Sequence, residues 1–258
     1  MFMTSALCAL VLVFGIVTAS SVLPEKFTQY SSFSGAAEQK SPTSNAMEAE
    51  KLRVERLNKP LQFEKGKRYV ALTFDDGPSR YTKDVLKILR DNEVRATFFV
   101  IGKQIKQGRT SIIAAHGQGC QIASHTYRHR YFPNKSRALF VKDVRKTRRI
   151  LRQQTGIDSA YVRLPYGATN KKMNKALKKM NIRKVFWTID TRDWSRPGVD
   201  KIVHRATKNV RNGSIILMHD GGGNREQTLK ALPQVIRILK DKGYEFCTVD
   251  DLYRFGIK

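Results

Sequence analysis

Two histidines and an aspartate have the types and spacing of a hydrolytic metal site. His125 and His129 lie four positions apart, a spacing that brings both imidazoles to one side of a helical turn. Asp76 follows an apolar run and offers a carboxylate as third ligand. Zinc sites that catalyse hydrolysis use three protein ligands and leave one coordination position open. The three residues therefore predict a catalytic metal site, although a His pair alone is more often incidental.

The adjacent carboxylates of Asp75 and Asp76 indicate a division of roles. Two acids side by side need separate partners, or one of them has a raised pKa. One can hold the cation while the other accepts a proton from water, whose pKa a zinc ion lowers from about 15.7 to about 7. Asp-Asp-Gly-Pro is also typical of turns and helix caps, so a purely structural interpretation exists, and both can hold at once.

Further polar clusters also follow apolar runs. They are Arg163-Leu164-Pro165-Tyr166-Gly167, Asp190-Thr191-Arg192-Asp193-Trp194 and Leu217-Met218-His219-Asp220. Taken singly, Arg163, Trp194 and His219 are most simply a surface cation, a core aromatic residue and a strand-end histidine. Loops at the carboxyl ends of parallel strands, however, are where α/β barrels assemble catalytic groups. Together the clusters predict one active site built from several strand ends.

The elements that must position these clusters alternate along the chain. Short β-branched and aromatic runs are separated by segments of helical period, for example 82–91 and 137–154. This pattern predicts repeated β-α units, a parallel sheet and an α/β fold. The predicted strands are 69–74, 97–101, 121–124, 161–164, 184–189, 214–218 and 244–248.

The motifs resemble the polysaccharide deacetylases with the NodB homology domain, carbohydrate esterase family 4. The resemblance covers roughly residues 68–255 and includes Thr-Phe-Asp-Asp-Gly-Pro, His-Thr-x-x-His, Arg-x-Pro-Tyr-Gly, Asp-x-x-Asp-Trp and Leu-x-His, in the family's order. It implies a single domain with a distorted (β/α)7 barrel, in agreement with the seven strands predicted from periodicity. Many members have Pro where Leu164 stands, a departure that concerns the groove wall.

The resemblance also implies roles for the residues of the first clusters. Asp75 would be the catalytic base, and Arg163 would pair with it and orient it. A divalent cation, zinc or cobalt, would be bound by Asp76, His125 and His129.

The later clusters would supply the general acid and the substrate contacts. His219 would protonate the departing amine, and Asp193 would hold the imidazolium and raise its pKa. The backbone N–H of the motif's tyrosine would help to stabilise the oxyanion. The substrate-binding residues implied by the resemblance are Tyr166, Pro165, Trp194 and Leu217.

The activity implied by the resemblance is metal-dependent hydrolysis of a carbon–nitrogen bond that is not a peptide bond. The expected reaction removes N-acetyl groups from an N-acetylglucosamine-containing polysaccharide, with peptidoglycan the first choice and chitin-like oligomers the second. O-deacetylation of a polysaccharide such as xylan is an alternative, because the same chemistry cleaves esters. An inactive wall protein that binds polyanions is a further alternative.

The charge of the chain indicates an anionic partner. It has 48 Lys and Arg against 22 Asp and Glu, a net charge of +26. Basic faces at 142–152 and 171–179 suit an anionic cell-wall polymer, although a charge run is usually only a solvated face. Signatures of nucleic-acid-binding folds do not accompany the charge, so nucleic acid is not the expected partner. We expect a monomer.

The amino-terminal region has the composition of an export signal followed by a linker. Residues 1–24 contain no charged side chain, and their apolar stretch 6–17 suits a signal peptide or an uncleaved membrane anchor. The domain is therefore expected to be secreted or to lie on the extracellular side of the cell envelope. Residues 25–65 are predicted to be a linker because 31–45 is mostly small and polar, and 66–258 is predicted to be the deacetylase domain.

Cysteine usage excludes a disulfide framework. Cys8 falls in the predicted signal, which leaves Cys120 and Cys247, both within apolar strand-like runs. We predict two separate buried thiols without a functional role.

Overall fold

A parallel sheet forms the centre of the computed structural model, which describes residues 44–257. Its strands are β1 (Arg68–Asp75), β2 (Thr97–Val100), β3 (Gln121–Ser124), β4 (Tyr161–Val162), β5 (Arg183–Lys184), β6 (Ile189–Asp190), β7 (Ser214–His219) and β8 (Tyr244–Phe246). The order across the sheet is β5-β4-β3-β2-β1-β7-β6, and β8 pairs with the start of β1. Every strand pair among the described residues is parallel, as predicted.

The fifth predicted strand is wrong in one respect. Residues 184–189 do not form one strand, because the segment changes partners halfway along. Val185 N–H donates to Val162 O at 2.9 Å on one edge of the sheet, and Thr188 N–H donates to Ile215 O at 2.9 Å on the other edge. The segment therefore bridges the two sheet edges, and β5 with β6 occupies one strand position. Counted in this way the strands have seven positions, which confirms the predicted distorted (β/α)7 barrel.

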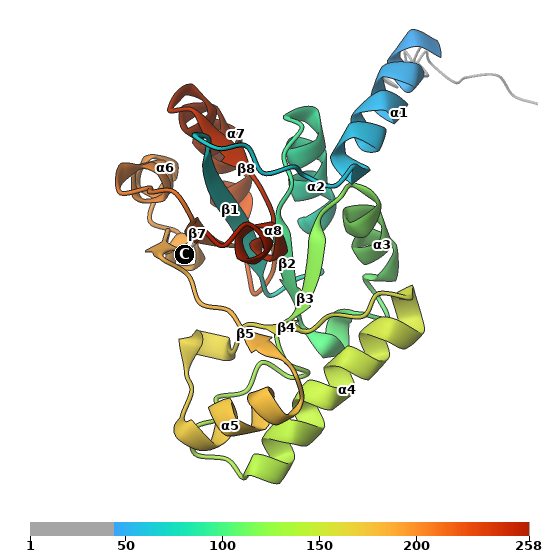
Figure 1. The fold of residues 1–258 in the computed structure, drawn as a ribbon, viewed down its shortest axis with the longest axis vertical. Coiled ribbons are helices and arrows are strands. Elements are labelled where there is room, and N and C mark those ends of the chain that lie inside the picture. Colours follow the sequence, from blue (N-terminus) through green and yellow to red (C-terminus); the bar gives the residue numbers. More distant parts are fainter. Residues whose placement is uncertain (1–43, 258) are drawn as a thin grey trace, which may run out of the picture. The chain divides into compact units, whose positions relative to one another are not determined.

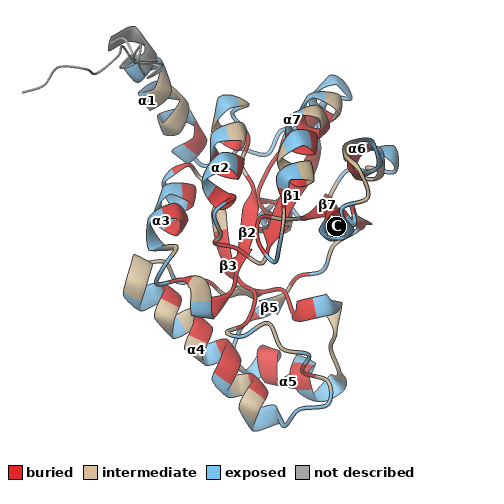
Figure 2. Cartoon of the chain, turned by 180° about the vertical axis from the view of Figure 1, so that it is seen from behind, coloured by how far each residue is buried: buried red, intermediate tan, exposed pale blue. Residues whose placement is uncertain are grey.

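The helices are α1 (Ser44–Asn58), α2 (Thr82–Asp91), α3 (Arg109–Gly117), α4 (Arg137–Thr155), α5 (Lys171–Lys179), α6 (Val199–Lys208), α7 (Glu226–Asp241) and α8 (Val249–Arg254). Of these, α2, α3, α6 and α7 cover the outer face of the sheet (Figures 1 and 2). Short 3₁₀ turns are η1 (Gly102–Gln104), η2 (Pro165–Gly167) and η3 (Asp193–Ser195). The helices predicted at 82–91 and 137–154 are confirmed within one residue.

Strand alternation divides the side chains of β1 between two apolar clusters. Val70, Leu72 and Phe74 pack in the large cluster that includes residues of α2, α3, α6 and α7. Tyr69 and Ala71 belong to a smaller cluster that includes residues of α8. Since successive side chains of a strand point to opposite faces, the second set shares the inner face of the curled sheet with Thr73 and Asp75. The inner face thus ends in polar side chains at the carboxyl ends of the strands.

Helices α4 and α5 form a separate layer below the main sheet in Figure 1, with an apolar cluster of their own. Phe140 and Val144 of α4 pack in this cluster with Met173 and Leu177 of α5. The serine at the start of α4 caps that helix, because the Ser136 hydroxyl accepts a hydrogen bond from Leu139 N–H at 3.2 Å. This layer is attached to the sheet through β4 and β5.

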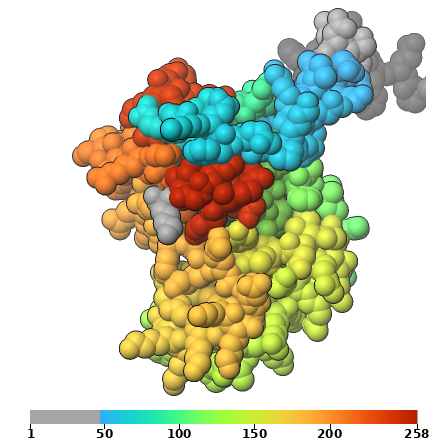
Figure 3. All heavy atoms as spheres, in the orientation of Figure 1, coloured from blue at the N-terminus to red at the C-terminus, as the bar shows by residue number. Residues whose placement is uncertain are grey.

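The predicted linker 25–65 differs from the structure in its second half. Helix α1 lies within it, and Leu57 near the end of α1 is buried. The segment after α1 also packs on the domain (Figure 3). In it, Phe63 lies against Phe255, with ring centroids 5.5 Å apart. The predicted signal 1–24 and residues 25–43 lie outside the described residues.

Two further features of the described residues are the apolar content of the helices and the state of the cysteines. Between residues 44 and 257, no helix combines the length and the apolar content that crossing a bilayer requires. Cys120 and Cys247 are both buried and unbridged, as predicted. Burial raises the pKa of the Cys120 thiol to about 12, so it stays protonated and unreactive at neutral pH.

Candidate active site

The inner face of the sheet brings the predicted residues to one end of the barrel. Asp75 is the last residue of β1, and His219 is the last residue of β7 and pairs with it in register. Both lie an even number of positions from inner-face residues of their own strands, Ala71 and Ile215. His125 and Arg163 extend β3 and β4 in the same way, two positions beyond Ala123 and Tyr161. Strand alternation therefore explains why residues from four strands meet.

Asp76, His125 and His129 form a three-residue cluster suited to a metal ion. Asp76 Oδ1 lies 3.5 Å from His125 Nε2 and 3.2 Å from His129 Nε2. An ion bound tetrahedrally at usual zinc distances would hold two such ligand atoms about 3.4 Å apart. The same carboxylate oxygen is buried and has no hydrogen-bond partner among the described residues, as a metal ligand would require. The residues present therefore fit a divalent metal.

The predicted helical turn between the two histidines is wrong. Residues 125–129 form an irregular loop in which Thr126 and His129 have φ angles of 67° and 51°, values that no right-handed helix contains. The imidazoles still meet, with ring centroids 4.9 Å apart. The backbone reversal, rather than helical spacing, brings them together.

His125 is held in one orientation by the backbone of the neighbouring strand end. Its Nδ1 lies 2.9 Å from Arg163 O, so Nδ1–H donates and Nε2 faces Asp76 with its lone pair. Burial is the main cause that lowers the pKa of His125, although the nearby Asp75 and Asp76 oppose it. A neutral imidazole with a hydrogen-bonded outer nitrogen is the form that binds metals.

Asp75 is paired with a fully buried arginine. Arg163 Nη1 donates to Asp75 Oδ1 at 2.8 Å and to Thr73 Oγ1 at 2.7 Å. The guanidinium has 0% exposure and lies over the ring of Phe99, 4.0 Å from its centroid. Because Arg163 is packed on all sides, it fixes one oxygen of the Asp75 carboxylate and leaves the other facing the site. Asp75 Oδ2 is 3.7 Å from His125 Nε2.

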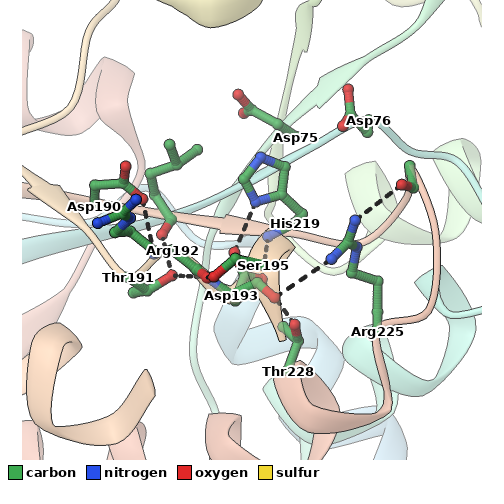
Figure 4. A network of polar contacts seen from close by, with 12 residues as sticks. Asp75, Asp76, Asp190, Thr191, Arg192, Asp193, Ser195, His219, Arg225 and Thr228 are labelled. Atoms are coloured by element: carbon green, nitrogen blue, oxygen red, sulfur yellow. Dashed lines mark hydrogen bonds and ion pairs between the residues drawn. The ribbon is translucent and has the colours of Figure 1, made fainter. Parts of the chain in front are cut away.

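On the opposite wall, His219 is held by a buried carboxylate (Figure 4). Its Nδ1 lies 2.7 Å from Asp193 Oδ1, while Asp193 Oδ2 accepts from His219 N–H at 2.9 Å and from Thr228 Oγ1 at 2.7 Å. Burial lowers the pKa of His219, but the hydrogen bond and charge of Asp193 outweigh it and raise the pKa above its ordinary value. For the carboxyl group of Asp193, burial alone would raise the pKa. The hydrogen bonds and charge of His219, with the hydrogen bond of Thr228, outweigh burial and lower the pKa of Asp193 below its usual range.

These groups surround a cavity of about 510 Å³. Its lining residues are Asp75, Asp76, His125, His129, Tyr166, Trp187, Asp190, Trp194, Leu217, His219, Gly222 and Arg225. Tyr166 and Trp194 are partly exposed at its edge, with 67% and 48% exposure, and Leu217 is buried. Pro165, expected at the substrate, is buried and is not part of the lining. Pro165 instead begins the tight turn in which Tyr166 has φ 61°.

Three lining residues were missed by the sequence analysis: Trp187, Gly222 and Arg225. Asp190 was part of a predicted cluster but had no role assigned to it. Arg225 is buried, and it donates to Gly221 O at 2.6 Å and to Gly222 O at 2.9 Å. These glycines belong to the run Gly221-Gly222-Gly223 that follows β7. Arg225 holds its carbonyl groups in place, and the only sequence signal was a lone cation after the glycines.

Asp220, directly after His219, supports the loop that carries the two aspartates. Its backbone N–H donates to Asp75 O at 3.1 Å, and its carboxylate accepts from Thr82 Oγ1 at 2.6 Å. Burial, aided by the charges of Asp75 and Asp76, raises the pKa of Asp220 to about 7. Any side chain at Gly77 would collide with this carboxylate, with its Cβ 2.2 Å from Asp220 Oδ2. The aspartate loop therefore rests directly on the end of β7.

Known proteins are similar to this chain in both amino-acid sequence and fold. The polysaccharide deacetylase family model matches residues 63–185. The chain is 36% identical over 191 residues to a peptidoglycan-N-acetylglucosamine deacetylase of Bacillus cereus, covering 73% of this chain and 89% of the relative. It is 37% identical over 187 residues to a chitooligosaccharide deacetylase of Sinorhizobium fredii, covering 68% and 87%.

The fold agrees with the sequence comparison. A crystal structure of a peptidoglycan N-acetylglucosamine deacetylase superposes with a TM-score of 0.71 at 31% identity, covering 74% of this chain and 90% of that one. Extended identity, shared fold and the converging site residues have one explanation: this chain is a member of the polysaccharide deacetylase family.

Proposed function

We propose that the chain removes N-acetyl groups from N-acetylglucosamine residues of a polysaccharide, with peptidoglycan as first substrate and chitin-type oligomers as second. The observation that carries the proposal is the pairing of a three-ligand metal cluster with an aspartate and a histidine on opposite walls of one cavity. The similarity to peptidoglycan and chitooligosaccharide deacetylases supports this substrate class.

Asp76, His125 and His129 would hold the divalent ion, zinc or cobalt. When bound, the ion supplies a Lewis acid that polarises the acetyl carbonyl and lowers the pKa of water. The Nδ1–H of His125 stays on the Arg163 carbonyl, which keeps Nε2 directed at the ion site.

Asp75 would be the general base. Its free carboxylate oxygen lies at the cavity, beside the metal cluster, where it can accept a proton from the attacking water. Arg163 holds the other oxygen and fixes the orientation of the carboxylate before the reaction. The backbone N–H of Tyr166, at the cavity edge, would donate to the oxyanion that develops on the acetyl group.

His219 would be the general acid. With Nδ1 on Asp193, its Nε2 is left to protonate the nitrogen of the departing amine. The raised pKa of His219 favours the protonated form that a general acid needs. Leu217 would contact the acetyl methyl group, while exposed Trp194 would stack on a sugar face.

The direct test is mass spectrometry of defined glycan fragments before and after treatment, with acetate measured in parallel. We expect mass loss at N-acetylglucosamine, abolished by chelation and restored by zinc or cobalt. Asp75→Asn should lower turnover by about 10²- to 10⁴-fold while metal binding persists. Asp84→Asn, at an exposed position of α2, is the matched control and should remain active.

Two outcomes would contradict the proposal. Ester substrates cleaved orders of magnitude faster than N-acetyl substrates would identify an O-deacetylase. No acetate from any substrate with any metal, together with a biological effect that survives Asp75→Asn, would identify a binding protein without catalysis.

We further propose that the protein acts outside the cytoplasm, either secreted or tethered through its N-terminal segment. The support is the apolar, uncharged composition of residues 1–24. Fusing residues 1–45 to a reporter that is active only after export tests this placement. An inactive reporter, with the fusion found in the cytosol, would contradict it.

A further inference from the structure

Residues 128–184, here named the basic lobe, carry a large positive charge of which the proposed reaction uses only Arg163. The lobe contains α4 and α5 with their own apolar cluster and forms the lower part of the molecule in Figures 1 and 3. Its sequence has 18 Lys and Arg against 2 Asp, which gives 18 − 2 = +16 of the chain's +26. More than half of the excess charge therefore lies in about a fifth of the sequence.

Most of these cations are exposed. The exposed cations are Arg128, Lys135, Arg137, Lys142, Arg145, Arg149, Arg152, Lys171, Lys172, Lys175, Lys178, Lys179 and Arg183. None of them forms a salt bridge within the described part of the chain. Of the two acids, Asp143 is buried and Asp158 is paired with Arg148 at 2.6 Å. The lobe thus presents cations without local counter-charges.

The cations are arranged in stripes along the two helices. At 3.6 residues per turn, Lys142, Arg145, Arg149 and Arg152 fall within an arc of about 80° on α4 and span about 15 Å. Lys171, Lys175 and Lys178 form a similar stripe on α5. Among the described residues, neither helix exposes a large hydrophobic side chain between its cations. A surface that inserts into a bilayer needs such side chains, so the stripes suit a water-exposed, linear polyanion better than a membrane.

The basic lobe is continuous with the active-site cavity. The loop that carries His129 continues through residues 130–136 into α4, and the turn that carries Tyr166 continues through residues 168–170 into α5. Tyr166 of the lobe lines the cavity, and exposed Tyr131 of the lobe lies beside it, with ring centroids 6.3 Å apart. A polymer bound with one sugar in the cavity would therefore place neighbouring parts near the lobe.

We infer that the basic lobe binds the acidic groups of the polysaccharide whose acetyl groups the cavity receives, that is, a wall glycan bearing carboxylates or phosphates. The inference rests on the proposed function and adds that anionic polymer is preferred over neutral glycan. Counterions released from such a polymer make its binding strongly dependent on salt, as for other polyanions.

The test compares two triple variants with the same loss of charge. The lobe variant is Lys171→Glu with Lys175→Glu and Lys178→Glu. The control variant is Lys201→Glu with Lys208→Glu and Lys230→Glu, exposed positions on α6 and α7 that are also free of salt bridges in the described structure. Binding is measured in the Asp75→Asn background with acidic wall glycan, the same glycan after removal of its phosphates, neutral chitin oligomers, duplex DNA and anionic lipid vesicles.

We expect the lobe variant to bind acidic glycan at least about tenfold more weakly at low salt, and the control variant to stay within about twofold. With Asp75 restored, turnover of neutral chitin oligomers should be unchanged in both variants, because the cavity is intact. Dephosphorylation identifies the source of the charge: weaker binding indicates phosphates, and unchanged binding indicates carboxylates.

Several results would overturn the inference. Equal weakening in both variants would show that net charge acts without a defined surface. Tighter binding to duplex DNA or vesicles than to acidic glycan would assign the lobe to another partner. A further outcome separates the two proposals. If no glycan is deacetylated but only the lobe variant binds acidic glycan more weakly, the proposed function is wrong and the basic lobe is still a binding surface.

Discussion

At the scale of single residues, the His219–Asp193 pair sets the pH range of activity. Asp193 raises the pKa of His219, so the acid remains protonated at a higher pH than an unpaired histidine. Asp193→Asn removes the charge that raises this pKa and should therefore move the alkaline limit of kcat to lower pH. The measurement is the pH profile of kcat.

Thr228→Val serves as the control for this prediction. It removes a neutral hydrogen bond to the same carboxylate and leaves the charge of Asp193 in place. The alkaline limit should then move by less than in Asp193→Asn. An alkaline limit that is identical in wild type and Asp193→Asn would show that His219 is not the acid that titrates.

At the scale of elements, the loop after β7 must approach the metal cluster closely. Gly222 has φ 73°, and a Cβ there would lie 2.5 Å from Asp76 Oδ2. Gly222→Ala should therefore displace a metal ligand and weaken zinc affinity by about 10- to 100-fold, as measured by competition with a chelating dye. Gly66→Ala is the control, because Gly66 also has positive φ but nothing within 4 Å of the added Cβ. Equal affinities in wild type and Gly222→Ala would contradict the geometry.

Helix α1 tests where the folded domain begins. Leu57 is 4% exposed, so Leu57→Ala should lower the free energy of unfolding by about 2–5 kcal/mol. Leu52 in the same helix is 49% exposed, and Leu52→Ala should cost far less. Turnover at a temperature where both variants are folded should match wild type, because α1 does not line the cavity. Equal denaturation midpoints for the two variants would indicate that α1 is only a linker.

At the scale of the whole molecule, the net charge of +26 opposes folding through self-repulsion. Raising ionic strength from about 0.01 M to about 1 M shortens the screening length from about 30 Å to about 3 Å. The melting temperature of the metal-free protein should therefore rise with sodium chloride. The triple lobe variant should show a smaller rise, since it starts with less positive charge. A melting temperature that falls with salt would mean that attractive ion pairs dominate.

Much of this architecture was accessible from the sequence because it depends on local order. In residues 69–75, successive side chains point to two different faces of the sheet, and in 82–91 the apolar side chains recur with a helical period. Both patterns are properties of a single element, so they can be read without knowing the tertiary structure. Polar residues at strand ends follow from the same alternation, so the gathering of Asp75, His125 and His219 was predictable once the strands were parallel. The motif order then indicated the family.

Local residue patterns and the order of the motifs were enough to predict most strands, the family and most of the residues with chemistry. How the chain bends between these elements depends on contacts in the folded protein. The split of 184–189 follows from pairing with β4 and then β7, the loop at 125–129 is closed by residues with positive φ, and Arg225 reaches the cavity through carbonyl groups of a glycine turn. Each of these three features depends on contacts with residues distant in the chain. The periodicity of a single segment contains no information about such contacts.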